Sequence, residues 1–251
     1  MKHGAPVIRM FLAAGVLAVA VAGADRSGDL STASILDPRD STLEPSQRLE
    51  ALLERCRTGQ SAIRTLEAEF EQRKENALLV DPNVAQGVFS YAAPDRVRWE
   101  YQTPDPISML ITEDELTTWY RDLGKVERIQ VGSRSQRVLE YLGAGSSLDD
   151  LMKYFTVSLV VPEATTEAYR LELLPRFERV AKRLKGIKIW IDSELYLPVG
   201  LRYVEADGDV TEYRFTNYRV NDDLPEDRFS LDLPSDVAIE AVDFDTRSAA
   251  R

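Results

Sequence analysis

The stretch Gly87–Tyr101 (GVFSYAAPDRVRWEY) constrains the fold of this chain most strongly, because apolar and polar residues alternate through both of its halves. Large apolar side chains recur at every second position: Phe89, Tyr91, Val97, Trp99 and Tyr101. This spacing is typical of strands that bury one face, and Pro94-Asp95 stands between the halves, where a turn is expected. We therefore predict a β-hairpin with aromatic side chains on one face and charged side chains on the other. The aromatic face covers either a packed core or a cavity.

Runs with the same alternation follow one another along most of the chain. The predicted strands are 66–74, Val84–Tyr91, Val97–Tyr101, Ser108–Ile111, Leu116–Tyr120, Val126–Val131, Tyr169–Leu174, Ile187–Asp192, Val199–Glu205, Val210–Tyr218 and Arg228–Leu231. Most of the connections are short, so strands that are neighbours in the sequence are expected to pair antiparallel. The expected fold class is mainly β, an unclosed antiparallel β-barrel of about ten or eleven strands with helices on its open side.

Helical spacing occurs in two places. Pro45–Gln60 carries one apolar stripe, made of Leu49, Leu52, Leu53 and Cys56, and predicts an N-terminal helix. Ser135–Leu142 and Ser147–Phe155 predict two more helices inside the run of strands, and the second has the stripe Leu148, Leu151, Met152 and Phe155. This insertion has to pack against the sheet. The basic segment Phe177–Lys185 is expected to be a loop or a single helical turn.

The first 24 residues have the pattern of a secretory signal. Lys2 and Arg9 precede or border the apolar run Met10–Val21, and Ala22-Gly23-Ala24 supplies small residues for cleavage. An uncleaved N-terminal anchor is the alternative. We expect a signal peptide over 1–24, a flexible polar leader over 25–42, a single domain over 43–239 and a disordered tail over 240–251.

Cleavage would limit the chemistry open to this protein. It removes His3, the sole histidine, so nucleophile–histidine pairs and histidine metal sites are not expected. Cys56 is the sole cysteine; a buried inert thiol is the expected state, and a reactive thiol is the alternative. The mature chain has 29 basic and 42 acidic residues, a net charge of −13, which argues against nucleic acid and against an anionic membrane surface as partners.

Carboxylates are plentiful, so a two-carboxylate glycosidase site stays open as an alternative. Glu67, Glu69 and Glu71, however, alternate with the apolar positions of a predicted strand, and a solvated outer face explains them better. We expect no enzymatic activity, no cofactor and no metal site. The residues left to carry a function are apolar and aromatic, and composition alone favours an ordinary core for them.

Several short motifs occur together in a recognisable order. They are Phe70-Glu71-Gln72, then Gly87–Pro94 (GVFSYAAP), Arg98–Tyr101 (RWEY), Thr112–Tyr120, and Phe229–Pro234 (FSLDLP) followed by Val237. From about Pro45 to Ile239 the chain resembles LolA, the family of periplasmic carriers of outer-membrane lipoproteins. The resemblance extends to a last strand around Phe229. The related acceptor family LolB is lipidated, and the lack of a cysteine at the predicted cleavage site favours the soluble carrier.

The resemblance implies a half-barrel closed by a helical lid, with a hydrophobic cavity for lipoprotein acyl chains. It implies a monomer in the periplasm that receives cargo from an inner-membrane lipoprotein-releasing transporter and passes it to an outer-membrane acceptor. The implied lipid-binding residues are Phe70, Phe89, Tyr91, Val97, Trp99, Tyr101, Leu110, Leu148, Met152 and Phe155.

One position departs from the family pattern. Members have a gating arginine directly before the proline of this hairpin, but Ala93 stands there in this chain. Either Arg96 takes over the gating role or the lid is held differently. The alternative functions are a carrier on the same fold for a different lipid, and a periplasmic sensor of envelope stress or another interaction module with a different ligand.

Overall fold

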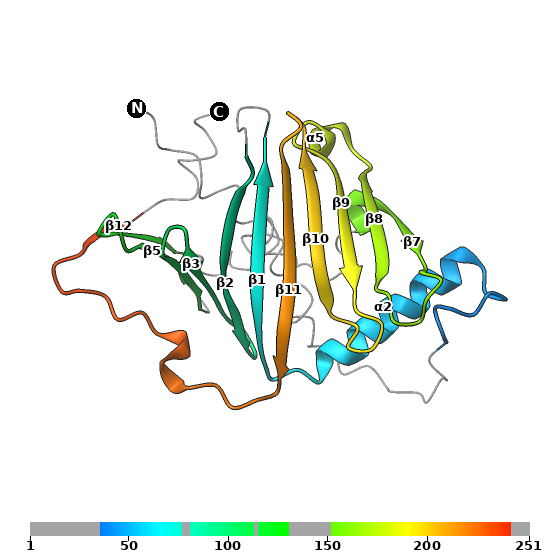
Figure 1. The fold of residues 1–251 in the computed structure, drawn as a ribbon, viewed down its shortest axis with the longest axis horizontal. Helices are drawn as coiled ribbons and strands as arrows, with labels where there is room; N and C mark the ends of the chain where they lie inside the picture. The colour runs from blue at the N-terminus through cyan, green and yellow to red at the C-terminus, as the bar shows by residue number, and fades with distance from the viewer. Residues whose placement is uncertain (1–35, 77–80, 113–114, 131–151, 242–251) are drawn as a thin grey trace.

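A computed structural model describes residues 36–76, 81–112, 115–130 and 152–241 of the chain (Figure 1). The helices of this part are α2 (Pro45–Ser61), α5 (Glu178–Ala181) and the 3₁₀ helix η2 (Glu226–Phe229). The strands are β1 (Thr65–Glu75), β2 (Asn83–Ala92), β3 (Arg96–Thr103), β4 (Ile107–Ile111), β5 (Glu115–Tyr120), β6 (Lys125–Gln130), β7 (Phe155–Val160), β8 (Tyr169–Pro175), β9 (Leu184–Ile191), β10 (Pro198–Glu205), β11 (Val210–Val220) and β12 (Ala238–Ala241).

The strands form one 12-stranded sheet in the order β12-β6-β5-β4-β3-β2-β1-β11-β10-β9-β8-β7. Two antiparallel meanders, β1–β6 and β7–β11, meet where β1 pairs with β11, and the sheet is strongly curved (Figure 1). The sequence prediction of an unclosed antiparallel sheet is therefore confirmed. β12 pairs with β6 in parallel, however, and brings the strand number above the predicted ten or eleven.

The strand register divides the sheet into two chemically different faces. Across β2 and β3, Phe89 lies opposite Trp99, and Trp99 in turn lies opposite Met109 of β4. We call the face that carries these side chains the inner face. The alternate residues, including Arg98 and Glu100, lie on the outer face. The predicted hairpin is thus confirmed, with its turn at residues 93–95.

Gly87 allows the ring of Phe70 and the backbone of β3 to approach strand β2 closely. A Cβ atom built at Gly87 would lie 2.0 Å from the carbonyl oxygen of Glu100 and 2.7 Å from Cζ of Phe70. No side chain fits there, and the register between β2 and β3 shifts at the same point, between Gln86 and Gly87. The ring of Phe70 therefore packs against the backbone of the hairpin.

Helix α2 begins and is buried as its sequence predicts. Glu44 and Gln47 cap each other's backbone amides, and Pro45 occupies the first turn. The buried stripe includes Leu52, Leu53 and Cys56, so the thiol is inaccessible. Burial raises the pKa of Cys56 to about 12, as expected for an inert thiol. In Figure 1 the helix lies along the lower end of β7–β10.

The described end of the predicted leader is held against the domain. Residues 36–42 contain turns, and the guanidinium of Arg39 donates to four backbone carbonyls between Pro162 and Glu167. The same guanidinium lies 4.8 Å from the ring centroid of Tyr169. This arrangement was not predicted, because it depends on a contact between segments more than 120 residues apart. Among the helices described, none combines the length and the apolar character needed to cross a bilayer.

Two predicted elements differ from the structure. Phe155 was expected to end a helix, but it begins β7, and its side chain is buried in the core of the sheet. Of the predicted helix Ser147–Phe155, residues 152–154 are described and form a helical turn. The rest of that helix, and the predicted helix Ser135–Leu142, lie outside the described residues.

The predicted strand Arg228–Leu231, the last strand of the resemblance, is wrong. This segment begins within η2 and continues without a strand partner until β12, and we call residues 221–237 the C-terminal strap. The guanidinium of Arg98 donates to the carbonyl oxygens of Arg228 (3.0 Å) and Ser230 (2.9 Å). These hydrogen bonds hold the strap against the outer face of β3. The strap crosses beneath β1–β3 and reaches β12 (Figure 1).

Candidate functional site

The inner face carries a continuous cluster of aromatic rings from β1, β2, β3 and β11. The ring of Phe70 lies 4.9 Å from that of Trp99 and 4.9 Å from that of Tyr101, both edge to face. Phe89 lies 5.0 Å from Trp99 on the other side. Tyr213 and Phe215 of β11 stack on each other and complete the cluster, each about 6 Å from Trp99. The cluster continues into the aliphatic side chains of β8–β10.

Most of the predicted lipid-binding residues lie together on this face. Those that the structure buries in one core are Phe70, Phe89, Tyr91, Val97, Trp99, Tyr101 and Phe155. Met152 is half-buried in the helical turn before β7, and Leu148 lies outside the described residues. Leu110 is buried, but it pairs with Arg98 and Thr117 and so lies on the outer face. The structure therefore does not bring Leu110 together with the others.

Sequence reasoning missed Tyr213 and Phe215. Both belong to a predicted strand, Val210–Tyr218, and their alternation indicated a buried face. What the sequence could not show was the partner of that strand: β11 pairs with β1, which begins about 140 residues earlier, so that Phe215 lies opposite Phe70.

A few polar groups are buried within the aromatic cluster. The amide of Gln72 donates to the hydroxyl of Tyr213, and that hydroxyl lies 3.4 Å from the hydroxyl of Tyr101. Burial raises the pKa of both tyrosines, so both stay protonated across the physiological range. Nε1 of Trp99 is buried and has no hydrogen-bond acceptor among the residues that the structure describes. The inner face is therefore mainly apolar, and its buried hydrogen bonds join Gln72, Tyr213 and Tyr101.

The outer face beside this cluster is built from ion pairs. Glu67 was expected to be solvated, but it is 8% exposed and accepts from Arg219 and Arg228, each at 2.9 Å. The difference arises because the C-terminal strap brings Arg228 over β1. Glu69 and Glu71 are exposed, as predicted. The ion pairs with Arg219 and Arg228 explain why a glutamate is buried at this position.

Glu100 is the centre of a second set of ion pairs on the outer face. It accepts from Arg98 at 2.6 Å and from Arg121 at 2.5 Å. Burial alone would raise the pKa of this carboxyl, but the hydrogen bonds from Arg121 and Arg98 outweigh burial and lower its pKa below the ordinary value. Glu100 is therefore ionised at neutral pH.

Arg96 and Ala93 are the positions that concern gating. Ala93 is exposed in the hairpin turn, and its amide donates to the carbonyl of Arg64 at 2.8 Å. Arg96 is exposed on the outer face, with its guanidinium 5.1 Å from the ring centroid of Phe229 in the strap. Arg98 lies on the face opposite Trp99, as predicted. Gating by Arg96 stays a prediction.

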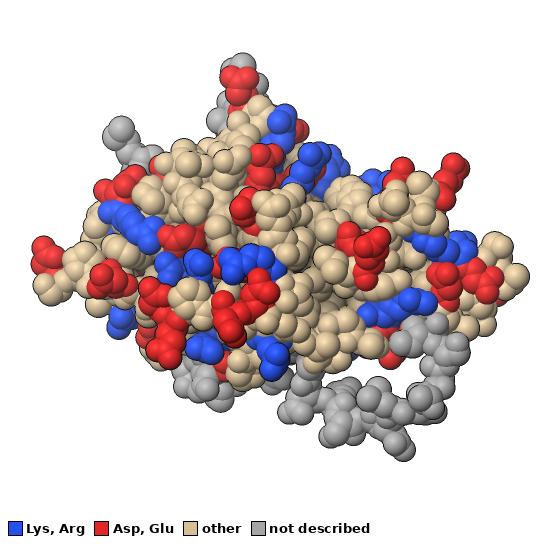
Figure 2. Space-filling model, turned by 60° about the horizontal axis from the view of Figure 1, so that its bottom comes forward, with Lys and Arg blue, Asp and Glu red and all other residues tan. Residues whose placement is uncertain are grey.

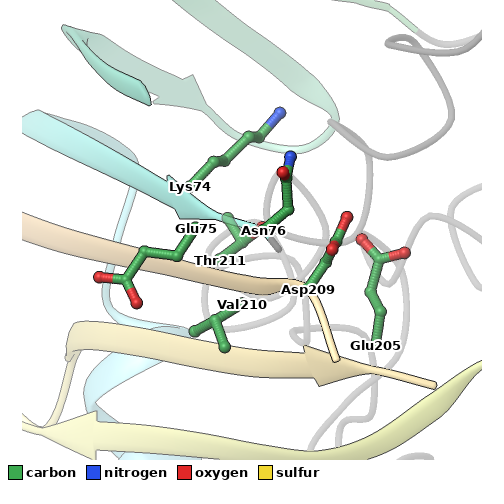
Figure 3. Close-up of a pocket in the computed structure, with 7 residues that line it drawn as sticks. All are labelled: Lys74, Glu75, Asn76, Glu205, Asp209, Val210 and Thr211. Atoms are coloured by element: carbon green, nitrogen blue, oxygen red, sulfur yellow. The ribbon is translucent and has the colours of Figure 1, made fainter. Parts of the chain in front are cut away.

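A small pocket lies at the far end of β1 and β11, away from the middle of the aromatic cluster (Figure 3). Its volume is about 50 Å³, and it is lined by Lys74, Glu75, Asn76, Glu205, Asp209, Val210 and Thr211. Ligand pockets for organic molecules are several times larger and mostly apolar, on the order of 300 Å³ or more. This polar pocket has neither the size nor the lining for an acyl chain. Within the described ranges, no three metal-ligating side chains converge to form a metal centre.

On the face that Figure 2 presents, the charged side chains are mixed in sign. Figure 2 shows Lys and Arg side chains interspersed with Asp and Glu over the face that it presents. Such a mixture is typical of a soluble surface rather than of a uniform basic track for nucleic acid. The inner face of the sheet is therefore the strongest candidate for binding.

The chain matches known proteins over most of its length. The model of the family described as "Outer membrane lipoprotein carrier protein LolA" matches residues 61–232. A curated relative, an outer-membrane lipoprotein carrier protein from Halorhodospira halophila, is 29% identical over 167 residues, which cover 64% of this chain and 72% of the relative.

Solved structures with a similar fold have low sequence identity to this chain. An uncharacterised conserved protein from Thermus thermophilus is 12% identical, with a TM-score of 0.50 over 77% of this chain and 99% of that one. A LolA superfamily protein from Nitrosomonas europaea is 11% identical, with a TM-score of 0.37 over 73% and 97% of the two chains.

Proposed function

This chain belongs to the LolA family, and we propose that it is a periplasmic carrier which shields the acyl chains of lipoproteins against the inner face of its sheet. Within this proposal it receives a lipoprotein from an inner-membrane transporter and delivers it to an acceptor at the outer membrane. The observation that supports the proposal is the aromatic cluster around Trp99, a continuous set of buried apolar side chains on the inner face of an unclosed sheet.

The free energy of exposing an acyl chain to water explains why a carrier needs such a face. One acyl chain of about 15 methylene groups costs roughly 12 kcal/mol when water surrounds it, at about 0.8 kcal/mol per methylene. Aromatic and aliphatic side chains can remove this surface from water without any directional contact. A sheet that is open at both edges can also widen or narrow, whereas a closed barrel has a fixed diameter.

The rings of the cluster are buried in the structure, with Phe89 0% and Trp99 1% exposed. An acyl chain can therefore reach them only if the packing over the inner face opens. Contacts between that packing and the rings would then be replaced by contacts with the acyl chain, so uptake and release would differ by a modest free energy.

Mass spectrometry of the protein purified from its own host tests this proposal. The expected result is a co-purifying lipoprotein, identified by a mass that includes its acyl chains. A co-purifying phospholipid without any lipoprotein would contradict the lipoprotein assignment and favour a carrier of another lipid. A tightly bound membrane protein with no lipid at all would contradict the carrier function and favour the interaction module.

A further inference from the structure

An exposed group of aromatic, aliphatic and basic side chains lies at one end of the second meander, away from the aromatic cluster. It lies around the end of β8, helix α5 and the turn before β7, which Figure 1 places at the upper right of the sheet. We call this group the basic–aromatic patch; its members are Tyr154, Leu174, Arg176, Phe177, Arg179 and Lys182.

The apolar members of the patch are unusually exposed. Leu174 is 61% exposed, and Phe177 and Tyr154 are each 45% exposed. The register explains why Leu174 faces solvent: Leu173 takes the inner face, so Leu174 lies on the outer face opposite Thr156. Beside it on β9 is Gly186, which has no side chain to cover it. Single exposed apolar residues are common, but three in one region indicate a contact surface.

Local contacts hold these side chains together. The amide of Arg176 donates to the carbonyl of Tyr154 at 2.9 Å, which joins the end of β8 to the turn before β7. Phe177 is the N-cap residue of α5, and the guanidinium of Arg179 lies 5.5 Å from the centroid of its ring. The guanidinium of Arg176 also donates to the carbonyl of Met152 at 3.4 Å, so the basic side chains of this surface lie beside its aromatic ones.

The charge of this region is opposite to the charge of the whole chain. Residues 174–188 contain six basic residues and one acidic residue, whereas the chain carries a net charge of −11. Lys188 is paired with Glu172 at 3.1 Å and Lys182 with Glu178 at 3.1 Å, but Lys182 and Glu178 are both more than 70% exposed. Such an exposed pair opens at little cost when another anion is available.

We propose that the basic–aromatic patch docks the protein onto a bilayer surface that contains anionic phospholipids. Arg176, Arg179 and Lys182 would contact the phosphate groups, while Phe177 and Leu174 would enter the boundary between head groups and acyl chains. Tyr154 suits the same boundary, because it has an apolar ring and a polar tip. The strongly acidic remainder of the chain is repelled by an anionic surface, so the protein would approach with this patch first.

The proposal departs from the expectation that the net charge argues against an anionic membrane surface, because it rests on the local charge of the patch. It is independent of acyl-chain binding on the inner face: either could hold without the other. It predicts weak and salt-dependent association, because only a few cations take part and ions screen them within about 8 Å at physiological ionic strength.

Co-sedimentation with vesicles tests the proposal. The full chain is mixed with vesicles of phosphatidylcholine alone, or with one quarter phosphatidylglycerol, at low and at physiological salt. Binding to the neutral vesicles measures the apolar contribution of the N-terminal segment, and the charge of that segment, from Lys2 and Arg9, is unchanged in the variants below. The expected result is tighter binding to the anionic vesicles that weakens as salt is added. Equal binding to both vesicle types would overturn the proposal.

Two matched triple variants locate the contact. Changing Arg176, Arg179 and Lys182 to serine removes the cations of the patch and should weaken binding to anionic vesicles about 100-fold, at roughly fivefold per cation. Changing Arg57, Arg73 and Arg214 to serine removes the same charge from exposed ion pairs elsewhere and should weaken binding much less. Equal losses in the two triple variants would also overturn the proposal, because they would show a dependence on net charge alone.

Phe177→Ser tests the apolar contribution without a change of charge. It should weaken binding severalfold, and unchanged binding would contradict the insertion of this ring.

Discussion

The substitution Gly87→Ala tests the packing of the aromatic cluster against the backbone of the hairpin. The added methyl group would lie 2.0 Å from the carbonyl oxygen of Glu100, and carbon and oxygen in ordinary contact are at least 3.4 Å apart. Strands β2 and β3 would have to separate by more than 1 Å, and the ring of Phe70, 2.7 Å from the methyl group, would also have to shift from its place beside Trp99.

The cost can be estimated from these contacts. Overpacking a core typically costs about 1–3 kcal/mol, and a clash with backbone on one side and a ring on the other belongs at the upper end. Alanine also restricts the unfolded chain, which offsets about 0.4–1 kcal/mol. We expect the free energy of unfolding to fall by about 2–3 kcal/mol, which lowers the thermal midpoint by roughly 4–12 °C in a chain of this size.

Gly59→Ala provides a matched control, because it makes the same chemical change in helix α2. Apart from its own helix, the nearest atom to the added methyl would be the carbonyl oxygen of Leu195 at 3.5 Å, an ordinary contact. Alanine is favoured over glycine inside a helix by about 0.5–1 kcal/mol, so this variant should be more stable than the natural protein. Chemical denaturation of both variants gives the comparison. If Gly87→Ala were as stable as the natural protein, the close approach of Phe70 and the hairpin would be refuted.

Two further predictions concern the outer face. Arg98→Leu removes an ion pair with Glu100 and two hydrogen bonds to the C-terminal strap, so the free energy of unfolding should fall by about 2–3 kcal/mol. Hydrogen exchange at the amides of β12 should accelerate in Arg98→Leu. It should not accelerate in the control Arg96→Leu, which removes only the contact between the Arg96 guanidinium and the ring of Phe229. Unchanged exchange in Arg98→Leu would show that the strap is held by other contacts. The pKa of Glu100 is lower in the folded protein than its ordinary value of 4.5, so its stabilising contribution is complete above pH 4.5 and disappears as the pH falls through the folded pKa. Stability measured over this acidic range should therefore fall less steeply in Glu100→Gln, and an identical slope would argue against the ion pairs with Arg98 and Arg121.

The elements that depend on local alternation could be predicted from the sequence. The hairpin Gly87–Tyr101 is specified by its own residues, since the spacing of Phe89, Trp99 and Tyr101 fixes which face is buried. The same holds for the strands of both meanders, where short connections leave antiparallel pairing as the natural outcome. Six of the predicted binding residues lie on this part of the inner face for that reason.

The elements that depend on distant contacts could not be predicted. The strap is held by Arg98, some 130 residues earlier, and no local pattern indicates that contact. Tyr213 reaches the aromatic cluster through the pairing of β11 with β1, which no local pattern indicates. β7 was missed for a different reason: Leu148, Leu151 and Phe155 extend a helical spacing up to the first residue of a strand. Leu110 was assigned to the wrong face because its strand, in which four of the five residues are apolar, is buried on both sides.

The three tryptophans of the chain allow a direct test of the central claim, that acyl chains bind against the inner face. Trp99 lies on the inner face, whereas Trp119 and Trp190 lie on the outer face. A brominated acyl chain quenches the fluorescence only of tryptophans that it touches. The measurement compares a variant with Trp119 and Trp190 changed to phenylalanine, which reports Trp99 alone, with Trp99→Phe, which reports the other two. We expect strong, saturable quenching of Trp99 and little quenching in Trp99→Phe. Saturable quenching of the outer tryptophans with no effect on Trp99 would contradict it.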